Sequence, residues 1–339
     1  MTSKERVLAR LAGERTDRPP NYSIVMGFAA KEVGASYREF VTDYRTLVRG
    51  GIHCHEQYGI DVLSVISDPM REAESFGTQT EIPENGVPHS KEPLLKSVRD
   101  IAKLRIPSLG KRAEDRLNAV RLYKEQAGDT CPVIGWTEGP IAEACILRGM
   151  QNLMADMLDE PIAAAVLMDI CTDFAIEFAL AQIEQGADII GVGDAAASLI
   201  GPALYEEFVL PRQQKIIKAI NDNGAKVKLH ICGNITKILP LVANTGADIV
   251  DIDWMVDFAT AVELLSKNGK STACGNFDPV GVLLQGTPKT VTDAVNKCIA
   301  ASNNRAAIAP GCEVPIHTHP ENLKAVYSAL TAYQEGALE

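Results

Sequence analysis

The sequence predicts a (β/α)8 TIM barrel, an α/β fold in which eight parallel strands alternate with helices. Three observations support this prediction. Short apolar segments alternate with helical segments, most regularly in the second half of the chain, and such alternation is typical of a parallel sheet. No Gly-x-Gly-x-x-Gly motif follows the first expected strand, which disfavours a doubly wound nucleotide-binding sheet. The length of 339 residues suits one barrel, so we expect residues 1–339 to form a single domain.

The first part of the chain contains the less regular elements. An N-terminal helical segment is expected from Lys4 to Gly13, where glycine and then Pro19-Pro20 end it. Residues 78–88 carry the Asn-Gly chemistry of a tight turn, and we expect them to form a hairpin excursion outside the main sheet rather than a functional lid. The expected strands of this part are 22–28, 61–69 and 131–140, and the expected helices are 37–41, 45–58, 97–104 and 112–125.

In the second part of the chain, expected strands and helices alternate regularly, as they do in a barrel of this class. Long helical stretches fill residues 141–186. After them the expected strands are 188–193, 225–232, 248–253, 271–275 and 306–309. The expected helices are 205–221, 236–243, 259–267, 288–300 and 321–333.

Composition and charge narrow the class of protein. A net charge of −11 disfavours nucleic acid and anionic membranes as partners. The charged N-terminus lacks the apolar core of a signal peptide, and no apolar run reaches the roughly 18 residues of a spanning helix. The eight cysteines are scattered, unlike a secreted disulfide framework. We therefore expect a cytoplasmic protein with reduced thiols.

One short stretch, 228–234, contains two candidate metal ligands. Side chains alternate along a strand, so His230 and Cys232 share one face while the apolar residues of the stretch share the other. This pattern alone fits a buried cysteine beside a hydrogen-bonded histidine equally well. Cys312, which follows another apolar strand 80 positions later, favours a metal site instead.

The three residues together suggest zinc. One imidazole nitrogen and two thiolates are borderline and soft ligands of the kind that select Zn²⁺. Three protein ligands leave one tetrahedral position open, as in catalytic sites, although Cys274 could fill that position and close the site. An open zinc with two thiolates suits a substrate thiol, which loses its proton on coordination and becomes a nucleophile.

Several carboxylates fall where barrel enzymes place their chemistry, at the carboxyl ends of strands. Asp68, Glu138, Asp194 and Asp253 each end an expected strand. On the strand 248–253 Val250 and Ile252 face the helices, so Asp251 and Asp253 are expected to point into the barrel. We predict that these four acids are catalytic, orienting a ligand or the substrate, with Asp253 the strongest candidate.

These motifs resemble the uroporphyrinogen decarboxylase superfamily. The resemblance is carried by His230-Ile231-Cys232-Gly233-Asn234, Cys312, Gly139-Pro140 and residues 321–325, and it extends over nearly the whole chain. The more similar branch is the zinc-dependent cobalamin methyltransferases, such as the methylcobamide:coenzyme M methyltransferases. The resemblance implies a barrel, Zn²⁺ on the His-Cys-Cys set, a corrinoid (methylcobalamin) carried by a partner protein, and a small-molecule thiol or other methyl acceptor.

Two departures from this branch lie beside the expected metal. The strand 248–253 ends in Asp251-Ile252-Asp253-Trp254, where a glutamate is expected, and Glu313 follows Cys312 directly. The acceptor therefore need not be coenzyme M.

Two other functions remain open. The first is a uroporphyrinogen decarboxylase-type lyase. However, the arginine-containing run that those enzymes carry after the first strand corresponds here to Met26–Ala30, which has no arginine, and only Asp68 keeps its counterpart. The second is a non-catalytic corrinoid-binding or metal-binding partner, which the open coordination position disfavours.

Overall fold

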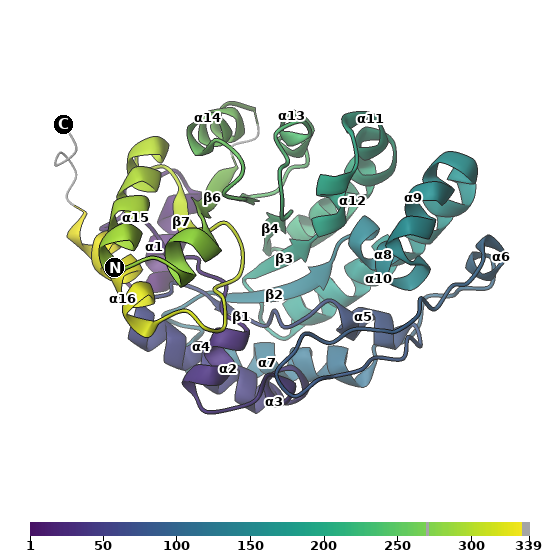
Figure 1. The fold of residues 1–339 in the computed structure, drawn as a ribbon, viewed down its shortest axis with the longest axis horizontal. Coiled ribbons are helices and arrows are strands. Elements are labelled where there is room, and N and C mark those ends of the chain that lie inside the picture. The colour runs from purple at the N-terminus through teal and green to yellow at the C-terminus, as the bar shows by residue number, and fades with distance from the viewer. Residues whose placement is uncertain (269–270, 334–339) are drawn as a thin grey trace.

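A curled parallel sheet of seven strands forms the centre of the computed structural model, which describes residues 1–268 and 271–333 (Figure 1). The strands lie in chain order, and each pairs in parallel with the next. They are β1 (Leu63–Ser64), β2 (Val133–Glu138), β3 (Ile189–Gly193), β4 (Lys226–His230), β5 (Ile249–Ile252), β6 (Thr272–Phe277) and β7 (Ala307–Pro310). The predicted α/β barrel class is confirmed, with seven regular strands instead of eight among the described residues.

The predicted first strand, 22–28, is wrong as a regular strand. Only a single parallel bridge, Asn21 with Ile308 of β7, occupies its place. The Tyr22 N–H donates to the Ile308 carbonyl (3.0 Å) and the Asp61 N–H donates to the Asn21 carbonyl (2.8 Å), so this segment still links the two edges of the sheet. The preceding prolines have no N–H to donate to a neighbouring strand. The Asn21 side-chain oxygen accepts a hydrogen bond from the Ser23 N–H (3.1 Å), and this contact turns the chain.

The other strands are mostly shorter than predicted. The strand expected at 61–69 keeps only β1, because the Ser64 hydroxyl accepts the Ile66 N–H (3.2 Å) and bends the chain away. The predicted hairpin excursion is confirmed: Glu81 and His89 exchange two backbone hydrogen bonds of 2.8 and 3.1 Å outside the main sheet.

Helices surround the outer side of the sheet (Figure 1). In the first half they are α1 (Ser3–Leu11), α2 (Gly27–Glu32), α3 (Tyr37–Thr42), α4 (Tyr44–Tyr58), α5 (Met70–Ser75), α6 (Val98–Ile101), α7 (Lys111–Ala127), α8 (Pro140–Arg148), α9 (Met150–Asp159) and α10 (Pro161–Glu184). Later come η1 (Ala195–Leu199), α11 (Pro202–Leu204), η2 (Tyr205–Val209), α12 (Leu210–Asp222), α13 (Leu239–Val242), α14 (Phe258–Asn268), η3 (Pro279–Leu284), α15 (Pro288–Ser302) and α16 (Pro320–Ala332).

The predicted helices agree with these bounds except at two places. The helix expected at 236–243 shortens to α13, and the one expected at 97–104 shortens to α6. Even α10, with 24 residues, lacks the apolarity that crossing a bilayer requires, and the same is true of the other described helices.

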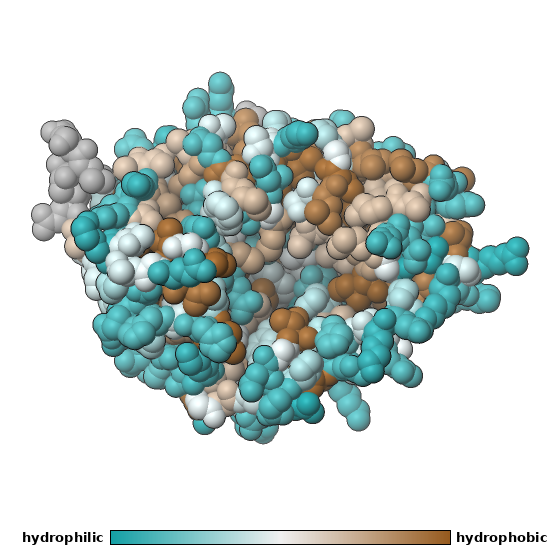
Figure 2. All heavy atoms as spheres, viewed as in Figure 1, coloured by the Kyte–Doolittle hydropathy of each residue, from teal (hydrophilic) through white to brown (hydrophobic). Residues whose placement is uncertain are grey.

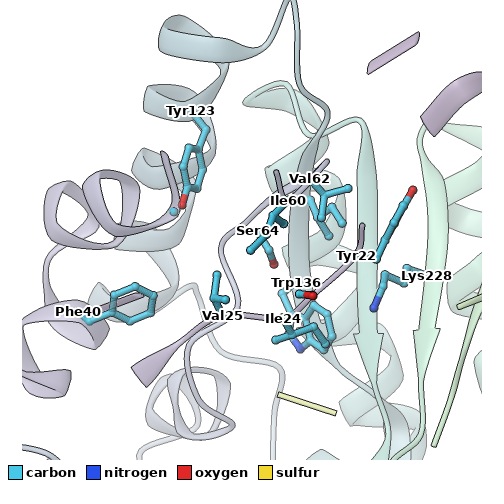
Figure 3. Close-up of a pocket in the computed structure, with 13 residues that line it drawn as sticks. Tyr22, Ile24, Val25, Phe40, Ile60, Val62, Ser64, Tyr123, Trp136 and Lys228 are labelled. Atoms are coloured by element: carbon cyan, nitrogen blue, oxygen red, sulfur yellow. The ribbon is translucent and has the colours of Figure 1, made fainter. Parts of the chain in front are cut away.

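The interior of the curled sheet is filled by side chains. A cavity of only about 20 Å³ lies there, and Tyr22, Trp136 and Lys228 are among the residues that line it (Figure 3). The Lys228 ammonium lies 5.7 Å from the centroid of the Trp136 ring. Such a cavity holds about one water molecule, so a substrate has to approach from the carboxyl ends of the strands.

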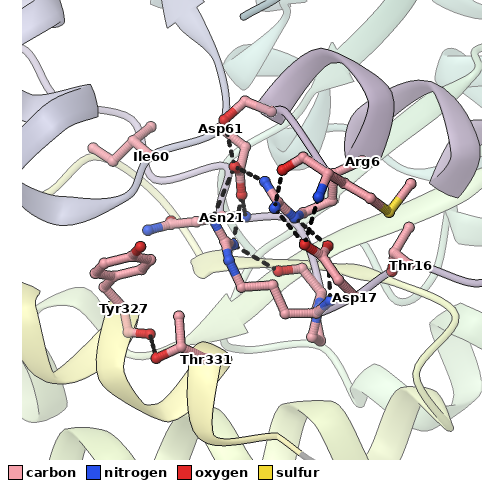
Figure 4. Close-up of polar contacts among 12 residues, drawn as sticks. Arg6, Thr16, Asp17, Asn21, Ile60, Asp61, Tyr327 and Thr331 are labelled. Carbon is pink, nitrogen blue, oxygen red and sulfur yellow. Dashed lines mark hydrogen bonds and ion pairs between the residues drawn. The ribbon is translucent and has the colours of Figure 1, made fainter. Parts of the chain in front are cut away.

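A buried ion cluster fixes the N-terminal segment to the sheet (Figure 4). The Asp61 carboxylate is fully buried and accepts hydrogen bonds from Arg6 (2.8 Å), from both terminal nitrogens of Arg18 (2.7 and 2.9 Å) and from the Asn21 N–H (2.7 Å). Two guanidinium groups and one amide therefore converge on a single carboxylate beside the segment that links the sheet edges.

Candidate metal centre

His230, Cys232 and Cys312 meet at the carboxyl ends of β4 and β7. The His230 Nε2 lies 2.8 Å from the Cys232 Sγ, and the two sulfurs lie 3.4 Å apart. All three candidate ligand atoms lie within 4.8 Å of one another. The structure therefore brings together the three residues that the sequence predicted as metal ligands.

Local backbone geometry makes this meeting possible. His230 is the last residue of β4 and points inward, with its ring 5.8 Å from that of Trp136 on β2. Gly233, just after Cys232, has φ 96°, a conformation that side chains disfavour. A Cβ on Gly311, just before Cys312, would lie 2.5 Å from the Trp254 nitrogen. Glycine at these two positions lets each cysteine loop turn toward the other.

Asp251 orients the histidine. Its Oδ2 lies 2.6 Å from the His230 Nδ1, and the same oxygen forms an ion pair with Lys228. Burial alone would raise the pKa of Asp251, but Lys228 and His230 outweigh it and hold this pKa at about 2. For His230 burial acts in the opposite direction and lowers the pKa, but the hydrogen bonds of the ring to Asp251 and Cys312 outweigh burial and raise this pKa to about 9. With Nδ1 engaged, Nε2 faces the cysteines and is placed to bind a metal.

The two thiols share a proton. A hydrogen bond from Cys232, aided by His230, outweighs burial and lowers the pKa of Cys312 to about 4. The same hydrogen bond and burial raise the pKa of Cys232. Because either sulfur can donate in the hydrogen bond between them, a metal that binds both sulfurs has to displace the shared proton.

This donor set fits zinc. Bond lengths of about 2.0 Å to nitrogen and 2.3 Å to sulfur separate tetrahedral ligand atoms by about 3.5–3.8 Å. The two sulfurs are already at 3.4 Å, and the nitrogen–sulfur pair at 2.8 Å would need to open by less than about 1 Å. Cys274 is not part of this cluster: it lies in β6, buried and paired in register with Asp251.

A cavity of about 130 Å³ opens beside His230. Its other lining residues are Met26, Ile66, Asp68, Pro69, Trp136, Glu138, Gly193 and Ala195. In the space-filling view the surface is hollowed over the middle of the sheet (Figure 2). The candidate metal centre is thus reached from the carboxyl ends of the strands, at a mainly apolar cavity with two acids.

Asp68 and Glu138 are the two predicted catalytic acids that reach this cavity. Asp68 forms an ion pair with Arg112 and accepts the Met70 N–H (3.0 Å). Glu138 lies 3.2 Å from a terminal nitrogen of Arg71, and burial raises its pKa despite that arginine. Neither arginine was singled out in the sequence, because both lie on helices rather than at strand ends.

Asp194 and Asp253 are not among the residues that line the cavity, and both accept hydrogen bonds from backbone or amide N–H groups. Asp194 is fully buried and accepts from the Ala142 N–H and the Gln213 amide, each at 2.8 Å; burial raises its pKa to about 7. Asp253 accepts the N–H groups of Gly233 and Met255, each at 3.0 Å. It thereby ties the Cys232 loop to the end of β5. The carboxylate that contacts His230 is that of Asp251, not that of Asp253. A catalytic role of Asp253 stays a prediction.

Comparisons with known proteins agree with this geometry. The uroporphyrinogen decarboxylase (URO-D) family profile matches residues 2–333. Methylcobamide:CoM methyltransferase MtbA of Methanosarcina acetivorans is 30% identical over 340 residues, and that of Methanosarcina mazei is 31% identical over 344 residues; each alignment covers 98% of both chains. Uroporphyrinogen decarboxylase of Geobacter sulfurreducens is 27% identical over 250 residues, covering 72% of this chain and 71% of that one.

A solved structure shows the same fold. The methyltransferase from Methanosarcina mazei superposes with a TM-score of 0.89 over 97% of this chain and 98% of that one, at 24% identity. A B12-independent methionine synthase from Shewanella matches less closely, with a TM-score of 0.59 over 92% of this chain and 96% of that one. From the match over almost its whole length, this chain belongs to the uroporphyrinogen decarboxylase family.

Proposed function

We propose that this protein is a zinc-dependent methyltransferase that moves a methyl group between a methylated corrinoid, carried by a partner protein, and a small thiol. One observation carries the proposal: an imidazole and two cysteine sulfurs lie within 4.8 Å at the edge of a cavity and leave a coordination position for a substrate. The whole-length similarity to methylcobamide:CoM methyltransferases supports it.

The residues of the chain have separate tasks in this reaction. His230, Cys232 and Cys312 would hold the metal, and Asp251 keeps the imidazole oriented through Nδ1. Zinc bound there would keep the sulfur of a substrate thiol deprotonated at neutral pH. The apolar cavity wall, with Trp136 beside the imidazole, excludes water from the reacting sulfur.

Cavity size supports a small thiol inside and a corrinoid outside. The cavity of about 130 Å³ is smaller than the roughly 300–1,000 Å³ of sites for drug-sized ligands. A corrin ring is larger still, so the methyl corrinoid has to be presented at the mouth of the cavity by another protein.

Decarboxylation of uroporphyrinogen is the second candidate, and the charges of the cavity disfavour it. A substrate with eight carboxylates needs free cations, best supplied by arginine. The arginines near the cavity are already paired with acids, and Met26–Ala30 leads into α2 without an arginine. We expect no coproporphyrinogen from uroporphyrinogen, and formation well above background would favour the lyase.

The proposed activity is tested by incubating the zinc-loaded protein with methylcobalamin and a panel of thiols under anaerobic conditions. We expect thiol-dependent loss of the methylcobalamin absorbance with the wild type and its absence with Cys312→Ser. A zinc-loaded protein that demethylates methylcobalamin with none of the thiols would refute the proposal and favour a non-catalytic metal-binding role.

A further inference from the structure

The cationic side chains behind the cavity are all engaged by acids of the chain. Arg71 pairs with Glu72 (3.0 Å) and Glu138 (3.2 Å) and is fully buried. Arg112 pairs with Asp68 and with Glu74 (2.9 Å). Among the described residues that line the cavity, only His230 can become a cation, and it belongs to the metal centre.

Lys228 is not available to bind an anionic substrate group either. Its ammonium forms an ion pair with Asp251, and its side chain is 2% exposed. It lies against Trp136 in the interior of the sheet, below the imidazole rather than in the cavity. The positive charge closest to the metal centre is therefore already neutralised by the carboxylate that orients His230.

Three backbone N–H groups near the mouth are also occupied. Amides at the starts of helices are natural binding sites for anions. Here the amide of Gly27 donates to Glu313 (3.3 Å), that of Met70 to Asp68 (3.0 Å) and that of Ala142 to Asp194 (2.8 Å). Carboxylates of the chain thus already engage three of the amides that could bind the anionic end of a substrate.

From these contacts we infer that the thiol acceptor has an uncharged or cationic tail, and that the site selects against anionic thiols such as 2-mercaptoethanesulfonate (coenzyme M). This inference rests on the proposed function. An anionic tail would enter a mainly apolar cavity, face Asp68 and Glu138, and find no cation free of an acid partner among the described side chains that line it.

Three thiols with the same two-carbon skeleton provide the test: 2-mercaptoethanol, cysteamine and 2-mercaptoethanesulfonate. Their binding is measured on the cobalt(II)-substituted protein from the thiolate-to-cobalt absorption, which requires no methyl transfer. Methyl transfer by the zinc protein is then measured with methylcobalamin and the same thiols. We expect 2-mercaptoethanesulfonate to bind about tenfold or more weakly than the other two.

Two variants connect the selectivity to named residues. Glu138→Gln removes the acid that engages Arg71 at the cavity wall, and Glu313→Gln weakens the contact that occupies the Gly27 amide. We expect either variant to raise the binding of the sulfonate severalfold relative to the binding of 2-mercaptoethanol. Because each thiol is compared with itself, differences in thiol acidity cancel. Glu177→Gln, at an exposed position on α10, removes one negative charge from the surface and should alter the binding of neither thiol.

The outcomes separate the inference from the proposed function. Binding in the expected order with no methyl transfer would support the inference and refute the methyltransferase. Methyl transfer with 2-mercaptoethanesulfonate bound as tightly as the other thiols would overturn the inference and leave the methyltransferase standing. Absence of binding by all three thiols would overturn both. An equal gain of sulfonate binding in Glu177→Gln would assign the effect to net charge and overturn the site assignment.

Discussion

Asp251 and His230 face each other across β4 and β5, with the carboxylate Oδ2 2.6 Å from the imidazole Nδ1. The strand register pairs the two residues directly. Lys228, two positions before His230, forms an ion pair with the same oxygen. The orientation of the metal-binding imidazole therefore depends on a carboxylate that is itself fixed by a buried cation.

Replacing this carboxylate should weaken metal binding. In Asp251→Asn the side chain keeps its size but loses its charge, and we expect zinc affinity to fall by about 10–100-fold. Competition with a chromophoric chelator measures the affinity. Asp293→Asn, at an exposed position on α15, should bind zinc as the wild type does. If Asp251→Asn bound zinc as tightly as the wild type, the Asp251 carboxylate would not be what orients His230 for metal binding.

The cysteines of β6 and of the β7 loop should behave differently. Cys312→Ser should lose most of its zinc while keeping the wild-type circular dichroism, because a hydroxyl is a poor replacement for a thiolate ligand. Cys274→Ser should keep its zinc, because Cys274 lies outside the three-residue cluster. Metal analysis after dialysis compares the two variants. Zinc loss in Cys274→Ser with an intact fold would make that thiol the fourth ligand.

The Asp61 cluster should matter for stability rather than for metal binding. Asp61→Ala leaves the buried guanidinium groups of Arg6 and Arg18 without their shared partner, so we expect a loss of about 3–5 kcal/mol in unfolding free energy. Asp17 also pairs with Arg6 but is 41% exposed, so Asp17→Ala should cost about 1 kcal/mol or less. Urea unfolding compares the two, and equal losses would contradict the assigned role of Asp61.

Glu143 should make stability depend on pH. It is 2% exposed, neither of its carboxyl oxygens has a hydrogen-bond partner, and burial, together with Glu72 and Glu138, raises its pKa well above 4.5. Above pH 4.5 the unfolded chain releases this proton while the folded chain retains it, so stability falls as pH rises toward the folded pKa.

Glu143→Gln removes this dependence. We expect the variant to gain stability relative to the wild type between pH 6 and pH 8, by up to about 1.4 kcal/mol per pH unit. Urea midpoints at three pH values measure the difference, and Glu177→Gln is the matched control. Parallel pH profiles for Glu143→Gln and the wild type would show that Glu143 ionises normally in the folded protein.

Much of the fold follows from periodicity in the sequence. The alternation of apolar strands with helices predicts the order and the parallel pairing of β2 to β7. It wrongly predicts a strand at residues 22–28, because this apolar segment leaves the sheet after the single bridge at Asn21 and its end begins α2. Short helices such as α2 and α5 have six residues each, too few to show a helical repeat in the sequence.

The metal ligands follow from the alternation of side chains along a strand, but the role of each acid does not. Both Asp251 and Asp253 were expected to point inward, and only the register between β4 and β5 decides which one reaches His230. The ion pair between Arg71 and Glu138 joins α5 to β2. These elements are far apart in sequence, so no local sequence pattern predicts the contact.

The central claim is that the three-residue metal centre activates a thiol for methyl transfer, and the most direct test follows the methyl group itself. Methylcobalamin with a deuterated methyl group is incubated with the zinc-loaded protein and 2-mercaptoethanol, and the products are analysed by mass spectrometry. We predict the deuterated methyl thioether, formed in proportion to the cobalamin consumed and absent with Cys312→Ser. Zinc-loaded wild-type protein that yields no more labelled thioether than Cys312→Ser, with this thiol or with cysteamine, would contradict the claim.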